Sequence, residues 1–404
     1  MNLEITSLPS PLRVIVVNPL VPAAQLIAVK ILSGTVFGTN QLIDLTLLVY
    51  SNELQMAEAF ILELENCAFS CVNSMHTSSN LPSITDADVF CFITNFPNPN
   101  CIDFYNVITD EMFDSFYLII KIANNLFGPI SNIAEIVKEN VINKKNIKSG
   151  QKPIFIADGL VAIDILKSLS TNVPYDVFFC PTPLTSIGKN ILGEYLKVET
   201  DEINDLLVWA ANDSVFHVEV EKPLVIQDTI SGDNCDWNLV GKDVLRKTNL
   251  DHTQFNESWL KKDFIEKMES FASRNPYGCI YKASQISKTL QDIWASRSTE
   301  CELKSYCSMG VISDESLGTI KGHPYVLPLI FSGDHWCVNE RFKENTHLKM
   351  EIKRINKVAQ EQHEKLITYC KHFLQENVLN QAFIPNDESS ASSITIDRLS
   401  RFSE

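Results

Sequence analysis

A turn near the start of the chain carries residues at the spacing of a nucleotide-binding motif. The segment 12–26 reads LRVIVVNPLVPAAQL, an apolar strand that runs into a helix. In a dinucleotide-binding turn, three glycines let the backbone approach the pyrophosphate, and free N–H groups at the helix start hold its charge. Here Asn18, Val21 and Ala24 stand at the three glycine-spaced positions. The pattern predicts the frame of a dinucleotide site without the glycines that such a site requires.

Other features of the same turn oppose phosphate binding. Val21 places a β-branched side chain where a phosphate would sit, and Pro19 and Pro22 each remove a backbone donor from the helix start. We therefore expect the turn to bind no nucleotide. From this segment alone, the alternative is a plain strand, turn and buried helix with no relation to nucleotide binding.

The cysteine and histidine spacings do not predict a metal site. The chain has 11 cysteines and 8 histidines, but it has no C-x-x-C pair and no H-x-x-x-H pair. The cysteines are scattered and often lie in apolar runs, as Cys91 and Cys180 do. This distribution favours a reducing compartment over a disulfide framework. We predict small core residues rather than metal ligands.

Length, composition and charge exclude several function classes. A chain of 404 residues that is 45% apolar and 21% charged can form two domains or one large α/β unit. Its formal net charge of −16 disfavours nucleic acid and anionic membranes as partners, because a negative field repels phosphate. The apolar segment 14–29 is too short and too interrupted to cross a membrane. The N-terminus has the pattern of neither a signal peptide nor a transit peptide, so we expect a cytoplasmic protein.

The elements that would position these residues follow an alternating pattern in the first half. Short apolar runs alternate with segments of helical periodicity, which predicts βαβ units and a parallel sheet. We expect strands at 12–17, 42–49, 87–94 and 153–157, with helices at 23–32, 53–65, 102–125 and 160–169. Residues 131–151 are polar and predict a helix followed by a surface loop.

The second half favours antiparallel strands and further helices. Strands are expected at VFFC, LLVWA, VFHVEV, PLVIQ and CSMGVIS, with a short helical turn capped by Thr200. Helices are expected at 257–273 and 283–294, and a long amphipathic helix at about 344–375. The predicted buried face of that helix comprises Ile352, Ile355, Leu366, Cys370 and Phe373. The Ser-rich segment after Pro385 predicts a disordered tail.

Six strings occur in a fixed order along the chain: SGTVFG, ELENCAF, DLLVWA, ESWLKKDFIEKM, DIW and SMGVIS. Together they resemble the cytosolic-type malate dehydrogenases of the lactate/malate dehydrogenase superfamily. The turn at Pro22 and the strings SPLRV and SGTVFG look most like the divergent 1B-like branch. The match covers roughly 12–97 and 176–373 and is weak between these segments.

The resemblance implies an α/β fold in which a Rossmann-like parallel-sheet domain precedes an α/β (α+β) lactate/malate dehydrogenase C-terminal domain. We expect an N-terminal lead at 1–11, a degenerate NAD-binding domain at 12–159, a C-terminal-like domain at 160–380 and a tail at 381–404. The resemblance also implies a homodimer and hydride transfer between malate and NAD. For the 1B-like branch it adds the cilium or flagellum as a second location.

The positions that the resemblance assigns to catalysis carry residues that cannot perform it. The catalytic histidine corresponds to Asn212, whose amide accepts no proton near neutral pH. Thr185 replaces the aspartate that orients the histidine, and Gly188 replaces an arginine that would clamp a substrate carboxylate. The mobile-loop arginines are missing from 96–99, and the N-P-A-N turn reads GLVA at 159–162.

The cofactor positions are altered as well. The acid that would bond the ribose hydroxyls corresponds to Val49, while Asn52 or Glu53 could substitute from the next turn or simply start a helix. With Asn18 and Val21 at the phosphate turn, we expect no NAD and no other cofactor.

These substitutions lead to one preferred interpretation and two alternatives. We predict a pseudoenzyme, a malate dehydrogenase-like fold that acts as a structural or protein-binding module with an unknown partner. The first alternative is an active NAD-dependent oxidoreductase with displaced groups such as His217, although this residue on the strand VFHVEV fits a structural role better. The second is a small-ligand sensor that uses the cleft without chemistry.

Overall fold

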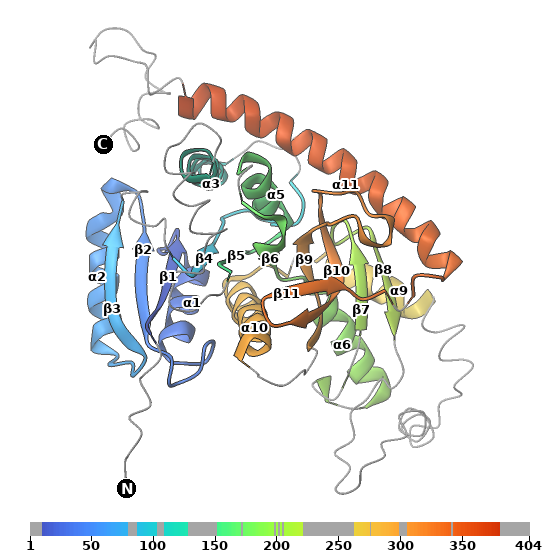
Figure 1. The fold of residues 1–404 in the computed structure, drawn as a ribbon, viewed down its shortest axis with the longest axis horizontal. Helices are drawn as coiled ribbons and strands as arrows, with labels where there is room; N and C mark the ends of the chain where they lie inside the picture. The colour runs from blue at the N-terminus through green and yellow to red at the C-terminus, as the bar shows by residue number, and fades with distance from the viewer. Residues whose placement is uncertain are drawn as a thin grey trace, which may run out of the picture.

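The computed structural model describes twelve parts of the chain, and their strands form one large sheet with helices on both faces (Figure 1). The sheet has eleven strands in the order β3-β2-β1-β4-β5-β6-β9-β10-β7-β8, with β11 paired to β10. The described residues are 10–79, 87–102, 109–127, 152–170, 173–197, 199–200, 203, 206–220, 262–274, 276–298, 305–340 and 342–379.

The first six strands are parallel and form the order 3-2-1-4-5-6 that is typical of a Rossmann sheet. This order confirms the predicted parallel sheet. One strand, β3, was not predicted, because its residues are mostly half-exposed and polar and show no apolar run. The six strands are β1 (Leu12–Val17), β2 (Ile43–Leu48), β3 (Val72–Ser78), β4 (Val89–Phe92), β5 (Ile154–Ala157) and β6 (Phe178–Cys180).

Helices cover both faces of this parallel half. The buried residues of α1 (Pro22–Leu32), α2 (Leu54–Asn66) and α10 (Cys279–Ser298) belong to one core cluster. Those of α3 (Asp110–Phe127) and α5 (Leu160–Leu169) belong to a second cluster. The helix expected from residue 102 begins at Asp110, and Ile102 itself lies outside it.

The second half of the sheet is antiparallel, as predicted. Its helices are α6 (Pro183–Leu196), α9 (Ile265–Ala272) and α11 (Thr346–Phe373), and its strands are β7 (Leu206–Ala210), β8 (Phe216–Val220), β9 (Ser305–Ile312), β10 (Pro324–Ser332) and β11 (His335–Val338). Three short 3-10 segments occur at Ser51–Glu53, Tyr175–Val177 and Ser316–Gly318, and a π-helical turn at Leu374–Leu379. The predictions for 131–151, 201–202, PLVIQ and the tail fall outside the described residues.

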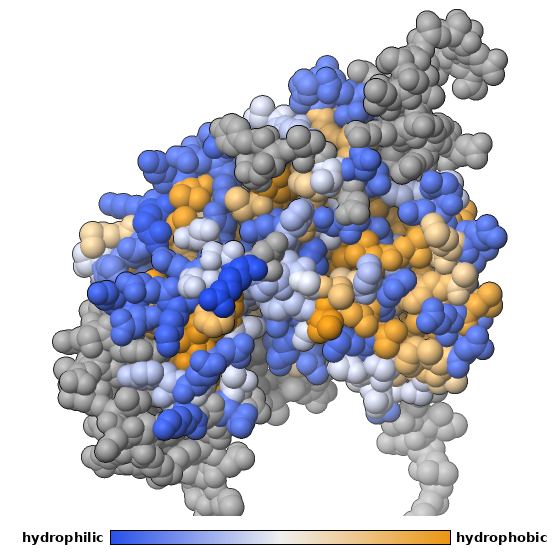
Figure 2. Space-filling model, turned by 180° about the vertical axis from the view of Figure 1, so that it is seen from behind, coloured by the Kyte–Doolittle hydropathy of each residue, from blue (hydrophilic) through white to orange (hydrophobic). Residues whose placement is uncertain are grey.

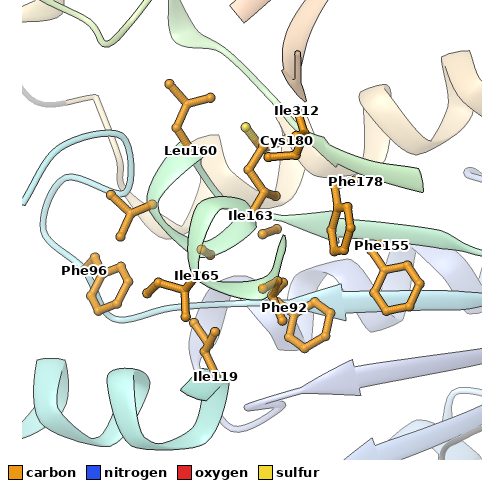
Figure 3. Packing of buried hydrophobic residues seen from close by; sticks show 14 of the residues in the cluster. Phe92, Phe96, Ile119, Phe155, Leu160, Ile163, Ile165, Phe178, Cys180 and Ile312 are labelled. Carbon is orange, nitrogen blue, oxygen red and sulfur yellow. The ribbon is translucent and has the colours of Figure 1, made fainter. Parts of the chain in front are cut away.

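Aromatic side chains fix the central strands against α5 (Figure 3). Phe155 of β5 stacks on Phe90 of β4 with 4.5 Å between the ring centroids, and it contacts Phe178 of β6 at 5.2 Å. All three rings are fully buried, and each contributes roughly 1.5–3 kcal/mol through removal of apolar surface from water. The ends of these strands are therefore held in fixed positions.

The long helix α11 crosses the α5 side of the molecule and continues to the antiparallel strands (Figure 1). Asn345 caps its start, because the side-chain oxygen accepts hydrogen bonds from the backbone N–H groups of His347 and Leu348. The five residues predicted for its buried face are all buried, which confirms that prediction. Among the helices that the structure describes, none is long and apolar enough to span a membrane.

Candidate functional site

The turn after β1 keeps the backbone shape of a glycine turn without a glycine. Asn18 lies in the left-handed region at φ 60°, a conformation that asparagine tolerates better than most residues. Its side-chain amide donates a hydrogen bond of 3.1 Å to the carbonyl oxygen of Ile93, just after β4. Asn18 therefore ties two strand ends together at the first glycine-spaced position.

The start of α1 offers few donors to a phosphate. Pro22 occupies the first helical turn and has no N–H group, and Val21 at the N-cap provides no side-chain cap. The N–H of Val21 donates to the carbonyl of Asn18 at 3.4 Å, and the N–H of Ala24 donates to that of Val21 at 2.9 Å. These residues do not fit a pyrophosphate group.

The end of β2 is equally unsuited to a ribose. Val49 is buried, and the hydroxyl of the next residue, Tyr50, donates to the carbonyl oxygen of Asp114 in α3 at 2.8 Å. The carboxylate of Glu53 accepts from the backbone N–H of Tyr50 at 3.4 Å, so it caps its own helical turn. Burial raises the pKa of Glu53. Asn52 is exposed at the same turn.

The residue at the catalytic histidine position stabilises a turn. Asn212 is buried, and its side-chain oxygen accepts hydrogen bonds of 2.8 Å from the backbone N–H groups of both Ser214 and Val215. The hydroxyl of Thr185, in place of the orienting aspartate, is buried and has no hydrogen-bond partner among the described residues. A Cβ atom on Gly188 would lie 2.3 Å from Cδ2 of Leu206, so α6 approaches β7 too closely for a larger side chain without rearrangement.

His217 does not join these positions. It lies on β8 opposite Trp209, and its Nε2 is 2.9 Å from the carboxylate of Glu219. Its ring also contacts that of His347 with 5.3 Å between centroids. These contacts are those of a structural histidine, the role that its strand pattern favoured.

A buried ion pair lies beyond the carboxyl ends of β4 and β5, where ligands bind in open α/β sheets. Nζ of Lys282 in α10 is 2.7 Å from Oδ2 of Asp158, and the two side chains are 7% and 0% exposed. Lys282 also donates to the carbonyl of Thr94 at 2.9 Å, and the hydroxyl of Thr94 donates to Asp158. The charges therefore compensate each other inside the protein.

A second polar group continues from this ion pair toward β7. The hydroxyl of Tyr277 and the side-chain amide of Asn100 both donate to the carboxylate of Asp213, the amide at 3.0 Å. Burial raises the pKa of Asp213, although these hydrogen bonds act in the opposite direction. Burial and the charge of Asp213 raise the pKa of Tyr277, which keeps the phenol protonated.

The segment that follows β4 caps the N-terminus of α5. The side-chain oxygen of Asn100 accepts from the N–H of Leu160 at 2.9 Å, and the carbonyl of Pro99 accepts from that of Val161 at 3.0 Å. A Cβ on Gly159 would lie 2.3 Å from the oxygen of Pro99. The helix N-terminus at the position of the N-P-A-N turn is therefore already capped by protein. We call this segment together with the two polar groups above the edge network.

The edge network could not be predicted from the sequence. Its members follow three different strands, β4, β5 and β7, or lie in and just before α10, with sequence separations of up to 188 residues. A buried lysine on a helix shows no local pattern, so only the fold reveals that Lys282 meets Asp158.

A groove of about 780 Å³ opens beside the edge network, between α5 and α11. Asn100, Leu160 and Ala211 border it at the strand ends. Its described lining includes Leu160 and Val161 of the N-P-A-N position, but none of Asn18, Val21, Val49, Thr185, Gly188 and Asn212. In the described parts of the chain, no group of three or more histidine, cysteine, aspartate or glutamate residues could hold a metal ion.

Known proteins resemble the chain in both sequence and structure. No protein-family model matches the sequence. Cytoplasmic malate dehydrogenase from Rattus norvegicus is 22% identical over 335 residues, which cover 81% of this chain and 88% of that protein. The crystal structure of malate dehydrogenase from Naegleria fowleri has a TM-score of 0.64 at 15% identity and covers 90% of this chain and 99% of that one. Trichomonas vaginalis lactate dehydrogenase in complex with NADH and oxamate has a TM-score of 0.59 at 15% identity, with 89% and 99% covered.

The chain belongs to the lactate/malate dehydrogenase superfamily. The strand order and the antiparallel second half agree with the Rossmann sheet and C-terminal domain that the resemblance implied. Within this superfamily fold, Asn18, Val21, Val49, Thr185, Gly188 and Asn212 all lie in buried or hydrogen-bonded local structure rather than around one open pocket.

Proposed function

We propose that the chain is a pseudoenzyme, a lactate/malate dehydrogenase fold that acts as a structural or protein-binding module without hydride transfer. The edge network carries this proposal. Lys282 and Asp158 neutralise each other where a substrate or nicotinamide would need free polar groups, and Asn100 caps the helix start beside them. Because these donors and acceptors already have protein partners, a ligand would have to break buried hydrogen bonds to use them.

The altered catalytic positions support the same proposal. A positioned acid/base contributes roughly 10²- to 10⁴-fold to a rate. Asn212 cannot take this role, and its side-chain oxygen is occupied by the turn at Ser214 and Val215. The alternative, an active malate/oxaloacetate oxidoreductase with displaced groups, has no supporting geometry at His217, which pairs with Glu219.

The proposal is tested by oxaloacetate-dependent oxidation of NADH, measured by absorbance. We expect no turnover above the buffer rate for the full chain. The variant Asn212→His/Thr185→Asp restores an acid/base and its orienting carboxylate, and it should also be inactive because the edge network remains. Turnover by the unmodified chain would support the oxidoreductase alternative, and turnover by the variant alone would show that the site is open. An active malate dehydrogenase serves as the positive control.

A protein partner requires an accessible surface, and the side of the molecule that carries α2 offers one. Figure 2 shows the molecule from behind, and apolar side chains gather at the right of this view, on the side that carries α2 in Figure 1. Leu26 of α1 and Met56 and Leu62 of α2 are exposed. We propose that this region contacts a second copy in a homodimer. Light scattering at micromolar concentrations should give twice the chain mass, and Leu62→Lys should reduce it toward the single-chain value.

A further inference from the structure

The groove between α5 and α11 has the size and lining of a small-molecule site. Its volume of about 780 Å³ lies within the range of roughly 300–1,000 Å³ in which proteins bind drug-sized ligands. Most of its walls are apolar, with Val161 from α5, Leu366 and Tyr369 from α11, and Ile102 from the segment after β4. Gln362 donates to Sγ of Cys101 at 3.1 Å and so connects that segment to α11.

One buried polar pair lies in these apolar walls. Nδ1 of His363 in α11 is 2.8 Å from Oδ1 of Asp164 in α5, and the Asp164 side chain is only 3% exposed. A carboxylate on Nδ1 orients the ring and holds the proton at that nitrogen. Nε2 of His363 has no hydrogen-bond partner among the described residues. The ring therefore retains one polar atom for a ligand.

The charges around the groove favour an anionic ligand over a cationic one. Asp164 is already engaged by His363 and by the hydroxyl of Ser168 at 3.2 Å, and Glu364 accepts from Gln360 at 2.9 Å. A cation would therefore find no unengaged carboxylate among the described lining residues. Lys365 at the rim has no described partner, so it adds positive charge at the entrance.

Protonation of His363 favours the same ligand. Burial acts to lower the pKa of His363, but the hydrogen bond and the negative charge of Asp164 outweigh this effect and hold the pKa above its usual value. His323, whose ring lies 4.1 Å from that of His363, has a lowered pKa because of burial and the charge of His363. His372 at the far end pairs with Glu376 at 3.1 Å. Among the described lining residues, the raised pKa thus favours the imidazolium form of His363.

We propose that this groove binds an apolar monocarboxylate, with its chain along Val161, Leu366 and Tyr369 and its carboxylate at Nε2 of His363. The groove includes Leu160 and Val161 from the N-P-A-N position, but its proposed polar contact, His363, is not among the positions that the resemblance assigns to catalysis. The site therefore does not depend on the proposed loss of catalysis.

The test is calorimetric titration of the full chain with decanoate at pH 6.5, and with 1-decanol as an uncharged probe of the same length. We expect saturable binding of decanoate at least tenfold tighter than that of decanol. His363→Gln keeps a donor for Asp164 but removes the imidazolium. It should weaken decanoate binding at least tenfold and change decanol binding by less than twofold.

A second variant tests the place of binding. Thr368 is exposed and lines the groove, so Thr368→Trp should weaken both probes at least tenfold while the melting temperature changes little. Met350→Trp, at an exposed position on the same helix outside the groove, is the matched control and should leave both affinities unchanged. Absence of decanoate binding, equal binding of both probes, or binding that Thr368→Trp does not alter would each overturn the proposal.

Discussion

The edge network and the groove beside α11 are neighbours, since Asn100 and Leu160 belong to both. They differ in the chemistry of their side chains. In the edge network, charged and polar side chains satisfy one another, as the 2.7 Å contact between Lys282 and Asp158 shows. In the groove, apolar walls surround an imidazole that still has an unengaged nitrogen. In the edge network the polar groups bind one another, whereas in the groove Nε2 of His363 has no hydrogen-bond partner among the described residues.

In this fold, unengaged polar groups and accessible space distinguish the groove as the better candidate ligand site, although the edge network also lies at the ends of the parallel strands. The carboxyl ends of parallel strands are where ligands bind in open α/β folds. Here Asn100, Lys282 and Tyr277 are engaged with other protein groups at those ends, while the groove opens directly beside them between α5 and α11. Changes to each region should therefore have different consequences.

The largest effect is expected for the ion pair of the edge network. Lys282→Met leaves the Asp158 carboxylate buried without its cation and should lower the free energy of unfolding by about 3–5 kcal/mol. Lys288→Met is the matched control, because Lys288 lies on the same helix and pairs with Asp292 while 64% exposed. That pair should contribute less than about 1 kcal/mol. Urea denaturation measures the free energy of unfolding of both variants. An equal decrease for the two would contradict the role of Lys282 as the cation that neutralises Asp158 in the edge network.

A smaller loss is expected where the segment after β4 touches α5. Gly159→Ala introduces a Cβ atom 2.3 Å from the Pro99 oxygen, and the extended backbone at Gly159 adds no strain of its own. The contact alone should cost about 1–3 kcal/mol. Gly278→Ala is the control, since its Cβ would meet no atom within 4 Å. If thermal melting gives the same stability for both variants, the segment does not press on the helix start as described.

The smallest effect concerns the groove and depends on pH. The pKa of His363 is lowered by burial but raised more strongly by Asp164, so it is higher in the folded than in the unfolded chain. Its interaction therefore stabilises the fold below the unfolded-state pKa of about 6.5, and this stabilisation is lost as pH rises through the folded-state pKa.

The stability difference between the unmodified chain and His363→Gln should thus be larger at pH 5.5 than at pH 8.5, by about 0.5–1 kcal/mol for a partly exposed pair. The exposed His372 serves as control, because its pair with Glu376 is 71% and 58% exposed and His372→Gln should change the free energy of unfolding by less than about 1 kcal/mol. A difference that grows toward high pH would contradict the assigned role of Asp164.

The sequence predicted the parts of the fold whose pattern is local. Apolar runs marked β1, β2, β4 and β5 because these strands are buried on both faces. The helical period of 3.6 residues placed the buried face of α11. Strand β3 was not predicted from the sequence because its residues are half-exposed at the edge of the sheet.

For the candidate site, the sequence predicted only that catalytic side chains are replaced. Asn212, Thr185 and Gly188 were found because short strings set their alignment with known dehydrogenases. Lys282 and Tyr277 were missed, since their partners lie up to 188 residues away and only the closed fold brings them together. His363 was missed because it stands among polar residues of a long amphipathic helix, a pattern that predicts exposure to solvent.

Fluorescence titration of the full chain with NADH tests the central claim most directly. The claim is that the edge network and the altered β1 turn leave no place for the dinucleotide. We expect no saturable change up to millimolar NADH, while an active malate dehydrogenase titrated in parallel gives a binding curve. Saturation with a micromolar dissociation constant would contradict the claim.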